Sequence, residues 1–410
     1  MIAKANQKRR RSGALIEVLA AFAKLGLTCF GGPIAHIGYF RDEFVVRRRW
    51  LDEQAYADLV GLCQFLPGPA SSQIGFSIGL MRAGYLGGLA AWFAFTLPSA
   101  ILLILFAYGA NELQGPVGAG LLHGLKLVAV AIVAQAVWGM ARALAPDRER
   151  ASIAAIAALI ILFSSASVAQ ICAIALGGVA GLWLCHAAPA SSGKGHMSIP
   201  VSRPVGLVCL VAFFLLLMGL PALVTWSHAQ GVALFDAFYR SGALVFGGGH
   251  VVLPLLREAT VTPGWVSDDV FLAGYGAAQA VPGPLFTFAA YLGAVMKPLP
   301  NGVAGAVISL IAIFLPGILV LMGTLPFWEA FRRRERAQAI MRGVNAAVVG
   351  LLGAALYDPV WTTSVKRPGD FGIALVGFVL LTVWKAPPLI VVAVSALGGV
   401  ALAFQGHAAS

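Results

Sequence analysis

The sequence predicts an all-α polytopic membrane protein, built from two inverted-topology repeats that contain broken, re-entrant helices. Three observations support this fold class. The 410 residues are 59% hydrophobic and only 11% charged, against about 25% charged in ordinary soluble domains. Continuous apolar runs approach or exceed the roughly 20 residues that a helix needs to cross a bilayer. A pair of glycine and proline motifs also occurs twice, about half the chain length apart.

The first copy of this pattern opens with Phe30-Gly31-Gly32-Pro33 and closes with Gln64-Phe65-Leu66-Pro67-Gly68-Pro69. The second copy opens with Phe246-Gly247-Gly248-Gly249 and closes with Gln279-Ala280-Val281-Pro282-Gly283-Pro284. The spacing is nearly constant, since 246 minus 30 is 216 and 279 minus 64 is 215. An internal repeat of half the chain, in an apolar protein, is typical of transporters built from two related halves.

Composition along the chain suggests where the halves divide. The polar stretch 189–203 is rich in Ser, Gly and Lys, as a flexible connection would be. We therefore expect a first repeat (1–188), a linker (189–203), a connecting transmembrane helix (204–230) and a second repeat (231–410). The apolar runs are continuous and do not alternate with polar residues, which favours helices over the strands of a barrel.

In the first repeat, an apolar helix at 14–30 should break at Gly31-Gly32-Pro33, because glycine and proline interrupt helical hydrogen bonding. Two helices too short to span, 53–65 and 69–81, are joined by Pro67-Gly68. Irregular backbone at membrane depth is tolerated where it is buried in protein or lines a cavity. Full spans at 85–108 and 117–140 should follow, and then a hairpin of 153–163 and 168–185.

The span 205–224 has no counterpart in the first half, so the second copy should lie inverted in the membrane. The loop charges agree. The arginines at 47–49 correspond to the uncharged stretch 260–264, whereas the basic stretch 332–336 corresponds to 109–116, which lacks Lys and Arg. By the positive-inside rule, the basic N-terminus is cytoplasmic.

Several function classes are disfavoured. The net charge of +11 gathers in short clusters at loop edges, which indicates membrane orientation and not nucleic-acid binding. No phosphate-binding loop of an ATP-driven pump is present, and no cofactor is implied. His, Cys and carboxylates do not occur at metal-ligand spacing. A membrane-embedded enzyme or a scaffold is disfavoured, since no nucleophile and base pair is visible.

Lys24 and Arg240 occupy equivalent positions, six residues before the phenylalanine that opens each glycine motif. A cation within an apolar helix is costly and marks a functional site by default. We expect the two cations to converge near the repeat interface and bind a divalent anion. The alternatives are snorkelling to a lipid headgroup or pairing with Glu17.

Pro69 and Pro284 each stand where a helix would begin, directly after a Pro-Gly break. The free amides of a first helical turn form an anion site, although a structural kink is an equal alternative. The side chains expected within reach of such an anion are Ser71, Ser72, Gln73 and Thr287, with Gln64 and Gln279 just before the breaks.

Other titratable residues near the breaks are candidates for a proton relay or a gate. Arg41-Asp42 and Arg257-Glu258 are equivalent neighbouring opposite charges, which form gate or surface ion pairs more often than substrate contacts. His36 and His250 follow the two glycine motifs but are out of register, since 250 minus 36 is 214. Packing is the alternative role for these histidines, and Glu17 is a further relay candidate.

These motifs and the two-half layout closely resemble the chromate ion transporter family in its long-chain form. The resemblance covers nearly the whole chain. It implies an inner-membrane protein that exports chromate from the bacterial cytoplasm, is driven by the proton motive force and gives chromate resistance. The residues themselves indicate only a secondary anion transporter in a lipid bilayer. Sulfate or another tetrahedral oxyanion therefore remains an alternative substrate, and a homodimer remains open.

Overall fold

The computed structural model describes residues 2–29, 32–110, 115–163, 169–185, 201–246, 251–328 and 334–408. Within these ranges the chain forms helices and their connections, without strands. Five described helical segments are long and apolar enough to cross a membrane, namely Ala70–Gly109, Val117–Arg142, Arg203–Ser227, Gly302–Phe327 and Gln338–Ser364. The predicted all-α polytopic class is therefore confirmed. Most of the predicted linker, 189–203, lies outside the described residues.

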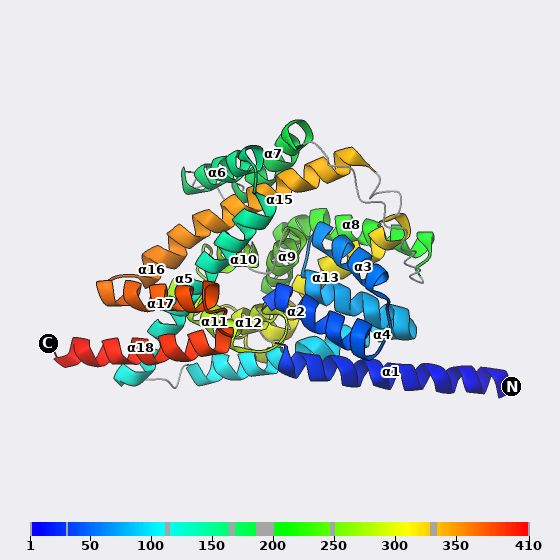
Figure 1. Cartoon of the computed structure of the whole chain (residues 1–410), viewed down its shortest axis with the longest axis horizontal. Coiled ribbons are helices and arrows are strands. Elements are labelled where there is room, and N and C mark those ends of the chain that lie inside the picture. The colour runs from blue at the N-terminus through cyan, green and yellow to red at the C-terminus, as the bar shows by residue number, and fades with distance from the viewer. Residues whose placement is uncertain are drawn as a thin grey trace.

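The first half runs from α1 to α7 (Figure 1). Its elements are α1 (Ile2–Thr28), α2 (Gly32–Arg41), the π-helical turn η1 (Asp42–Arg47), α3 (Glu53–Phe65), α4 (Ala70–Ala110), α5 (Gly115–Leu144), α6 (Arg148–Phe163) and α7 (Ala169–Leu184). α1 is longer than the predicted helix 14–30, because it continues through the basic N-terminal residues.

The second half follows α8 (Arg203–Ser227). It consists of α9 (Gln230–Ala243), α10 (Val252–Thr260), α11 (Asp268–Ala280), the short η3 (Leu285–Thr287), α12 (Phe288–Val295), α13 (Gly302–Thr324), the short η4 (Leu325–Phe327), α15 (Glu335–Ala355), η5 (Leu356–Trp361), α16 (Thr362–Ser364), α17 (Pro368–Thr382) and α18 (Pro388–Ala408). The ends of α1 and α18 lie at opposite ends of the long axis (Figure 1).

Equivalent helices of the two halves begin at equivalent residues. α3 begins at Glu53 and α11 at Asp268, a difference of 215. The same kind of N-cap sets both starts, since the Asp52 side chain accepts from the Ala55 amide at 2.7 Å and the Ser267 hydroxyl from the Val270 amide at 3.4 Å. Such caps satisfy amides that the first helical turn leaves without acceptors.

The long helix α4 contains a reversal of direction. Ala83 and Gly84 depart from helical geometry, and a Cβ placed on Gly79 would lie 2.3 Å from the Gly87 carbonyl oxygen. Eight residues of straight helix would separate these glycines by about 12 Å. The chain therefore folds back at Ala83–Gly84, which confirms the predicted division between the helices 69–81 and 85–108. α12 and α13 form the equivalent hairpin, in which Gly293 packs on Gly305.

Helices are exchanged between the halves at the other end of the fold. α5 of the first half packs against α17 and α18 of the second half, while α15 of the second half packs against α6 and α7 of the first. Small residues allow the close approach: a Cβ on Gly124 would lie 2.4 Å from the Ser395 carbonyl, and one on Gly343 would lie 2.0 Å from the Gly177 carbonyl. Helices of the two halves thus pack directly on one another at this end of the fold.

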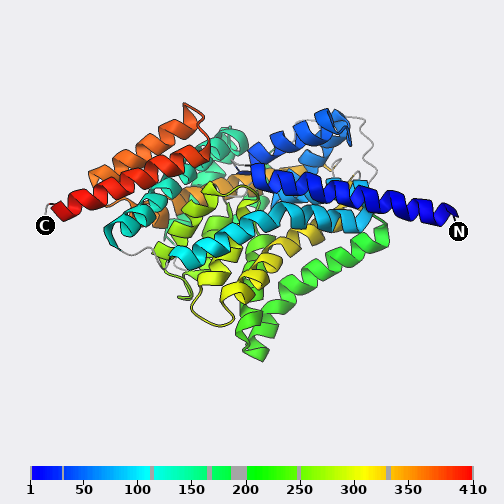
Figure 2. The same ribbon diagram turned by 90° about the horizontal axis from the view of Figure 1, so that it is seen from below.

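α8 has no equivalent in the first half and lies at the edge of the molecule (Figure 2). Phe213 and Leu220 are buried, but most of its apolar side chains are exposed, including Leu215 and Met218. Exposed apolar residues along a helix of 25 residues suit contact with lipid tails. α8 is long and apolar enough to cross a membrane, and it lies where the sequence predicts a connecting span.

Candidate functional site

The two Pro-Gly-Pro breaks are bonded to the opposite halves of the chain. The Gly68 amide, in the first half, donates to the Val245 carbonyl at 2.7 Å. The Gly283 amide, in the second half, donates to the Cys29 carbonyl at 2.9 Å. The donors are equivalent, since 283 minus 68 is 215, and so are the acceptors, since 245 minus 29 is 216. Each acceptor stands just before the glycine motif of its own half.

Backbone conformation and close packing both require glycine at positions 68 and 283. Gly68 has φ of +113° and Gly283 has φ of +101°, a region that side-chain-bearing residues rarely adopt. A Cβ on Gly68 would lie 2.8 Å from the Gly317 Cα, and one on Gly283 would lie 2.8 Å from the Ser99 Oγ. Gly317 and Ser99 each follow a proline within a helix of the other half. The breaks are therefore seated against the opposite half with no space for a side chain.

Polar side chains gather at the first break, where α4 begins. His36 and Ser71 are buried, and the His36 Nδ1 lies 3.4 Å from the Ser71 Oγ. The ring of His36 also meets the edge of Phe95, with centroids 5.4 Å apart. The Gln73 amide nitrogen donates to the Pro67 and Gly317 carbonyls at 2.9 Å each, which fixes the break against α13.

Several polar atoms on α2 and near the start of α4 have no hydrogen-bond partner among the described residues. They are the His36 Nε2, Ser72 Oγ, Gln73 Oε1 and Ser77 Oγ, and all four side chains are buried, the most exposed being Ser72 at 4%. Buried polar groups in proteins are nearly always bonded, and each one left without a partner costs roughly 1–3 kcal/mol. Such a cluster is suited to a polar ligand or to water.

The second break has a different lining. The Thr287 hydroxyl donates to the Pro284 carbonyl at 2.8 Å within its own turn. Its neighbours Phe286 and Phe288 are buried. Gln279 is half-buried with an unpartnered side-chain nitrogen, whereas Gln64 is exposed at the end of α3. The predicted side chains Ser71 and Ser72 therefore share one buried polar group, while Thr287 is occupied elsewhere.

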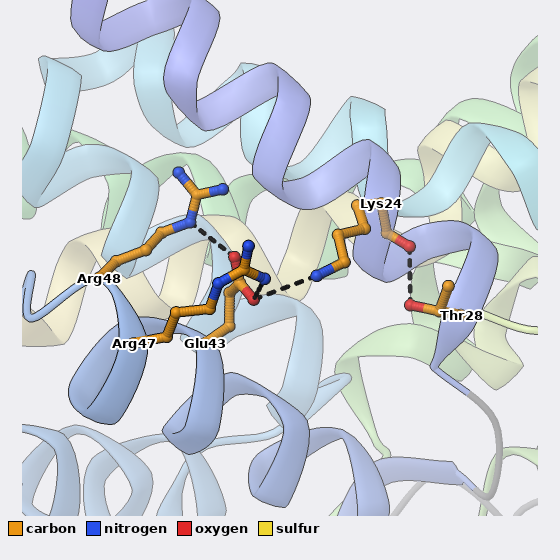
Figure 3. A network of polar contacts seen from close by, with 5 residues as sticks. All are labelled: Lys24, Thr28, Glu43, Arg47 and Arg48. Atoms are coloured by element: carbon orange, nitrogen blue, oxygen red, sulfur yellow. Dashed lines mark hydrogen bonds and ion pairs between the residues drawn. The ribbon is translucent and has the colours of Figure 1, made fainter.

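Lys24 belongs to a cluster around Glu43, which is 6% exposed (Figure 3). The Glu43 carboxylate accepts from Arg48 at 2.6 Å, from Arg47 at 3.0 Å and from Lys24 at 3.5 Å. Burial by itself would raise the Glu43 pKa, but the Arg48 hydrogen bond and the three positive charges outweigh burial and lower the pKa below its ordinary value. Three cations on one carboxylate leave this cluster with two positive charges in excess.

The predicted pairing of Lys24 with Glu17 is wrong. Glu17 accepts instead from Arg82 at 2.6 Å, because Arg82 reaches α1 from the end of the first α4 segment. Arg240, the equivalent of Lys24, lies 3.8 Å from Asp236 one turn earlier on α9. Each of the two predicted cations thus lies near a carboxylate of its own half, the shared Glu43 of η1 for Lys24 and Asp236 of α9 for Arg240.

The candidate gate arginines, Arg41 and Arg257, form ion pairs with the first residue of a later helix and not mainly with the acidic residue next to them in sequence. Arg41 donates to Glu53 at 2.6 Å, although it also lies 3.8 Å from Asp42. Arg257 donates to Asp268 at 2.8 Å, whereas the Glu258 carboxylate accepts from the Thr262 hydroxyl at 3.0 Å. Glu53 and Asp268 are equivalent, since 268 minus 53 is 215, and each begins the helix that follows the arginine. The predicted pairing of Arg257 with Glu258 is therefore wrong.

Two polar pairs between the halves were missed by the sequence reasoning. Lys126 on α5 donates to Asp269 on α11 at 2.5 Å. The His123 Nε2 lies 2.8 Å from the buried Asp370 carboxylate, which begins α17. The sequence did contain a signal for these pairs, because His123 and Lys126 lie within the predicted span 117–140. Polar and charged side chains within a membrane span are usually paired with polar partners.

The remaining predicted residues stand at the glycine motifs. Gly32 begins α2 with φ of +77°, as a break after α1 requires, and Pro33 follows it in the helix. Gly31, Gly247, Gly248, Gly249 and His250 lie outside the described residues.

A helical membrane protein with two linked halves, paired helix breaks and a buried unpartnered polar group has the architecture of a secondary transporter. Comparison with known proteins specifies the family. The chain belongs to the chromate transporter family, which it matches over residues 16–182 and again over residues 232–400.

Curated relatives agree with this assignment. A chromate transport protein of Pseudomonas aeruginosa is 29% identical over 395 residues, which cover 93% of this chain and 90% of the relative. A chromate transport protein of Cupriavidus metallidurans is 25% identical, over 96% of this chain and 94% of the relative. The uncharacterised transporter YwrA of Bacillus subtilis is 29% identical, over 42% of this chain and 98% of its own length. No solved structure gives a significant match.

Proposed function

We propose that the protein is a secondary active transporter that exports chromate from the cytoplasm across the bacterial inner membrane. The proton motive force drives this export, which confers chromate resistance. The observation that carries the proposal is the reciprocal pair of backbone hydrogen bonds, Gly68 to Val245 and Gly283 to Cys29. Each joins a helix break to the other half, and transporters hold substrates where such breaks meet at the interface of their repeats.

The two halves are proposed to lie antiparallel in the membrane, with the N-terminus in the cytoplasm. The extra span α8 and the opposed charges of equivalent loops support this arrangement. The ion pairs Arg41–Glu53 and Arg257–Asp268 then lie at opposite faces. Their equivalent positions suit two gates that open alternately.

Chromate is a dianion at neutral pH, so a path through protein requires positive charge and hydrogen-bond donors. The excess charge around Glu43 attracts the anion, and Lys24 in this cluster lies five residues before Cys29, whose carbonyl binds the second break. Arg240 and Gln279 are the proposed contacts from the second half. Arg240 is only 39% exposed, and its distance to Asp236 is long enough to leave guanidinium donors free.

The decisive experiment is chromate transport by the purified protein in liposomes with imposed pH gradients. We expect accumulation that one direction of the gradient stimulates and that its reversal does not. Equal transport with and without a gradient would contradict proton coupling, and no transport above that of protein-free liposomes would contradict the proposed function.

Sulfate is the second candidate substrate, because hydroxyl groups and an imidazole recognise a tetrahedral dianion without distinguishing sulfur from chromium. Labelled sulfate and chromate, each competed with the other in the same liposomes, separate the two. Preference for chromate appears as weak competition by sulfate, whereas stronger uptake of sulfate would reassign the substrate.

A further inference from the structure

The two breaks are equivalent in backbone but not in side chains. His36, Ser71 and Gln73 correspond to Val252, Phe286 and Phe288, by differences of 216, 215 and 215. The first set is buried and polar, and the second set is buried and apolar. A symmetric pair of substrate sites, or one site lined equally by both breaks, would need donors on both sides. The donors are concentrated in the first half.

The first turn of α4 adds backbone donors to this polar group. Its first intrahelical hydrogen bond runs from the Gln73 amide to the Pro69 carbonyl at 3.0 Å. The amides of Ala70, Ser71 and Ser72 precede that bond, so the helix itself offers them no acceptor. Together with the positive end of the helix dipole, they favour an anion. In the second half, the Thr287 amide closes its turn onto Pro284 at 3.0 Å.

His36 is placed to act as a neutral donor. Its ring is fully buried, and the described polar groups that act on it are the Ser71 hydroxyl and the Cys29 carbonyl. A buried imidazole without a carboxylate partner is neutral, because burial disfavours the charged form. When the Ser71 hydroxyl donates to Nδ1, the proton is on Nε2, which is the unpartnered atom. This Nε2–H makes no hydrogen bond to a described residue, although the Cys29 carbonyl also acts on the ring.

We propose that the protein has one oxyanion site, at the N-terminus of α4, in which His36 Nε2–H, the Ser72 hydroxyl and the first-turn amides hold a fully deprotonated tetrahedral dianion. This site rests on the proposed transport function and places the bound anion against the first half, while Arg240 and Gln279 contact the anion on its path through the second half. The second break is then a structural seat for the opposite half. Its unpartnered acceptor is the neutral Gln73 Oε1, and no carboxylate is present among the described residues, so we expect sulfate and chromate to bind more tightly than hydrogen phosphate, whose proton a carboxylate accepts best.

Isolated unpartnered hydroxyls elsewhere supply matched controls. Ser395, between α18 and α5, is as buried as Ser72 and also lacks a described partner. Val252 occupies the position equivalent to His36. The substitution pairs are therefore Ser72→Ala with Ser395→Ala, and His36→Leu with Val252→Leu. His36→Gln, which keeps an amide donor, serves if His36→Leu does not fold.

The test is calorimetric titration of the purified full chain with inorganic sulfate, which is redox-inert, followed by chromate and phosphate. We expect one sulfate per chain and an affinity reduced about tenfold or more in Ser72→Ala and His36→Leu, as loss of a hydrogen bond to a charged ligand implies. His36→Gln should be intermediate. The control variants Ser395→Ala and Val252→Leu should stay within about twofold of wild type, and phosphate should bind weakly.

Failure of this site and failure of the transport function give different results. Oxyanion binding by wild type that Ser72→Ala and both His36 variants leave unchanged would overturn the site while the transport function stands. Two sulfates per chain, or equal losses in the control variants, would do the same. Absence of any oxyanion binding by the folded wild-type protein would overturn both.

Discussion

The backbone amide of Gly68 and the backbone carbonyl of Val245 lie 2.7 Å apart, although 177 residues separate them in the chain (245 minus 68). The bond is repeated by Gly283 and Cys29, so each half of the protein holds the helix break of the other. A movement of one half relative to the other would therefore strain or break these two hydrogen bonds at the helix breaks.

Replacement of Gly68 or Gly283 by leucine should abolish chromate export and leave the amount of protein in the membrane largely unchanged. A side chain is excluded at both positions by positive φ and by contact with Gly317 or Ser99. Export from cells, normalised to membrane protein, measures the effect. Gly219→Leu is the control, because Gly219 on α8 has open space around it. Full activity of both break variants would refute a role in transport.

Lys24→Gln and Arg240→Gln should each reduce chromate export by about tenfold or more, since each removes a positive charge beside the proposed path of a dianion. Arg240→Lys should retain part of the activity, because the charge survives without the guanidinium geometry. Initial export rates of the three variants decide this prediction. Wild-type rates in both glutamine variants would mean that these cations only anchor the protein at the membrane surface.

Glu43→Gln should destabilise the protein by roughly 2 kcal/mol at pH 7, because three cations lose their shared carboxylate; the estimate is discounted for the exposed Lys24 and Arg47. The folded pKa of Glu43 is lowered, so its contribution is complete above the unfolded pKa of about 4.3 and is lost as the pH falls through the folded value.

Thermal unfolding in detergent should accordingly show a gap between wild type and Glu43→Gln at pH 7 that narrows below about pH 4. The substitution Glu258→Gln is the control, since Glu258 is held only by the Thr262 hydroxyl. A gap that stays constant, or widens as the pH falls, would show that the carboxylate charge is not what stabilises the cluster.

Val46 and Thr262 are exposed residues in equivalent loops, since 262 minus 46 is 216. If the halves are antiparallel, a cysteine at position 262 should react with a membrane-impermeant thiol reagent in intact cells, and a cysteine at position 46 should react only after lysis. The assay uses a background in which the five native cysteines are replaced. Reaction of both from the same side would exclude inverted repeats.

The sequence was sufficient to predict the all-α class and the positions of the helix breaks, because glycine, proline and long apolar runs act locally. The division at Ala83–Gly84 was also predicted, as the gap between two helices, but the reversal of direction there was not. The two-half layout was visible because every landmark recurs at a nearly constant offset.

Side-chain partners could not be predicted in the same way. Arg41 and Arg257 have acidic neighbours in sequence, yet successive helical residues point in different directions, and the partners come from the next helix start. Thr287 matched Ser72 in the repeat register, but only the folded turn reveals that its hydroxyl is already bonded to Pro284. The contact of His36 with Ser71 depends on the packing of α2 against α4, which the sequence alone does not reveal.

The exchange of helices between the halves also has a consequence for biosynthesis. α5 is complete at Leu144, but the helices that cover it, α17 and α18, begin at Pro368 and Pro388. Because α17 and α18 are synthesised last, more than half of the chain is translated after α5 is complete. During that time α5 lacks the helices that cover it in the folded protein. A ribosome that stalls before residue 388 therefore releases a first half that is inserted but incompletely packed, which membrane quality control can recognise.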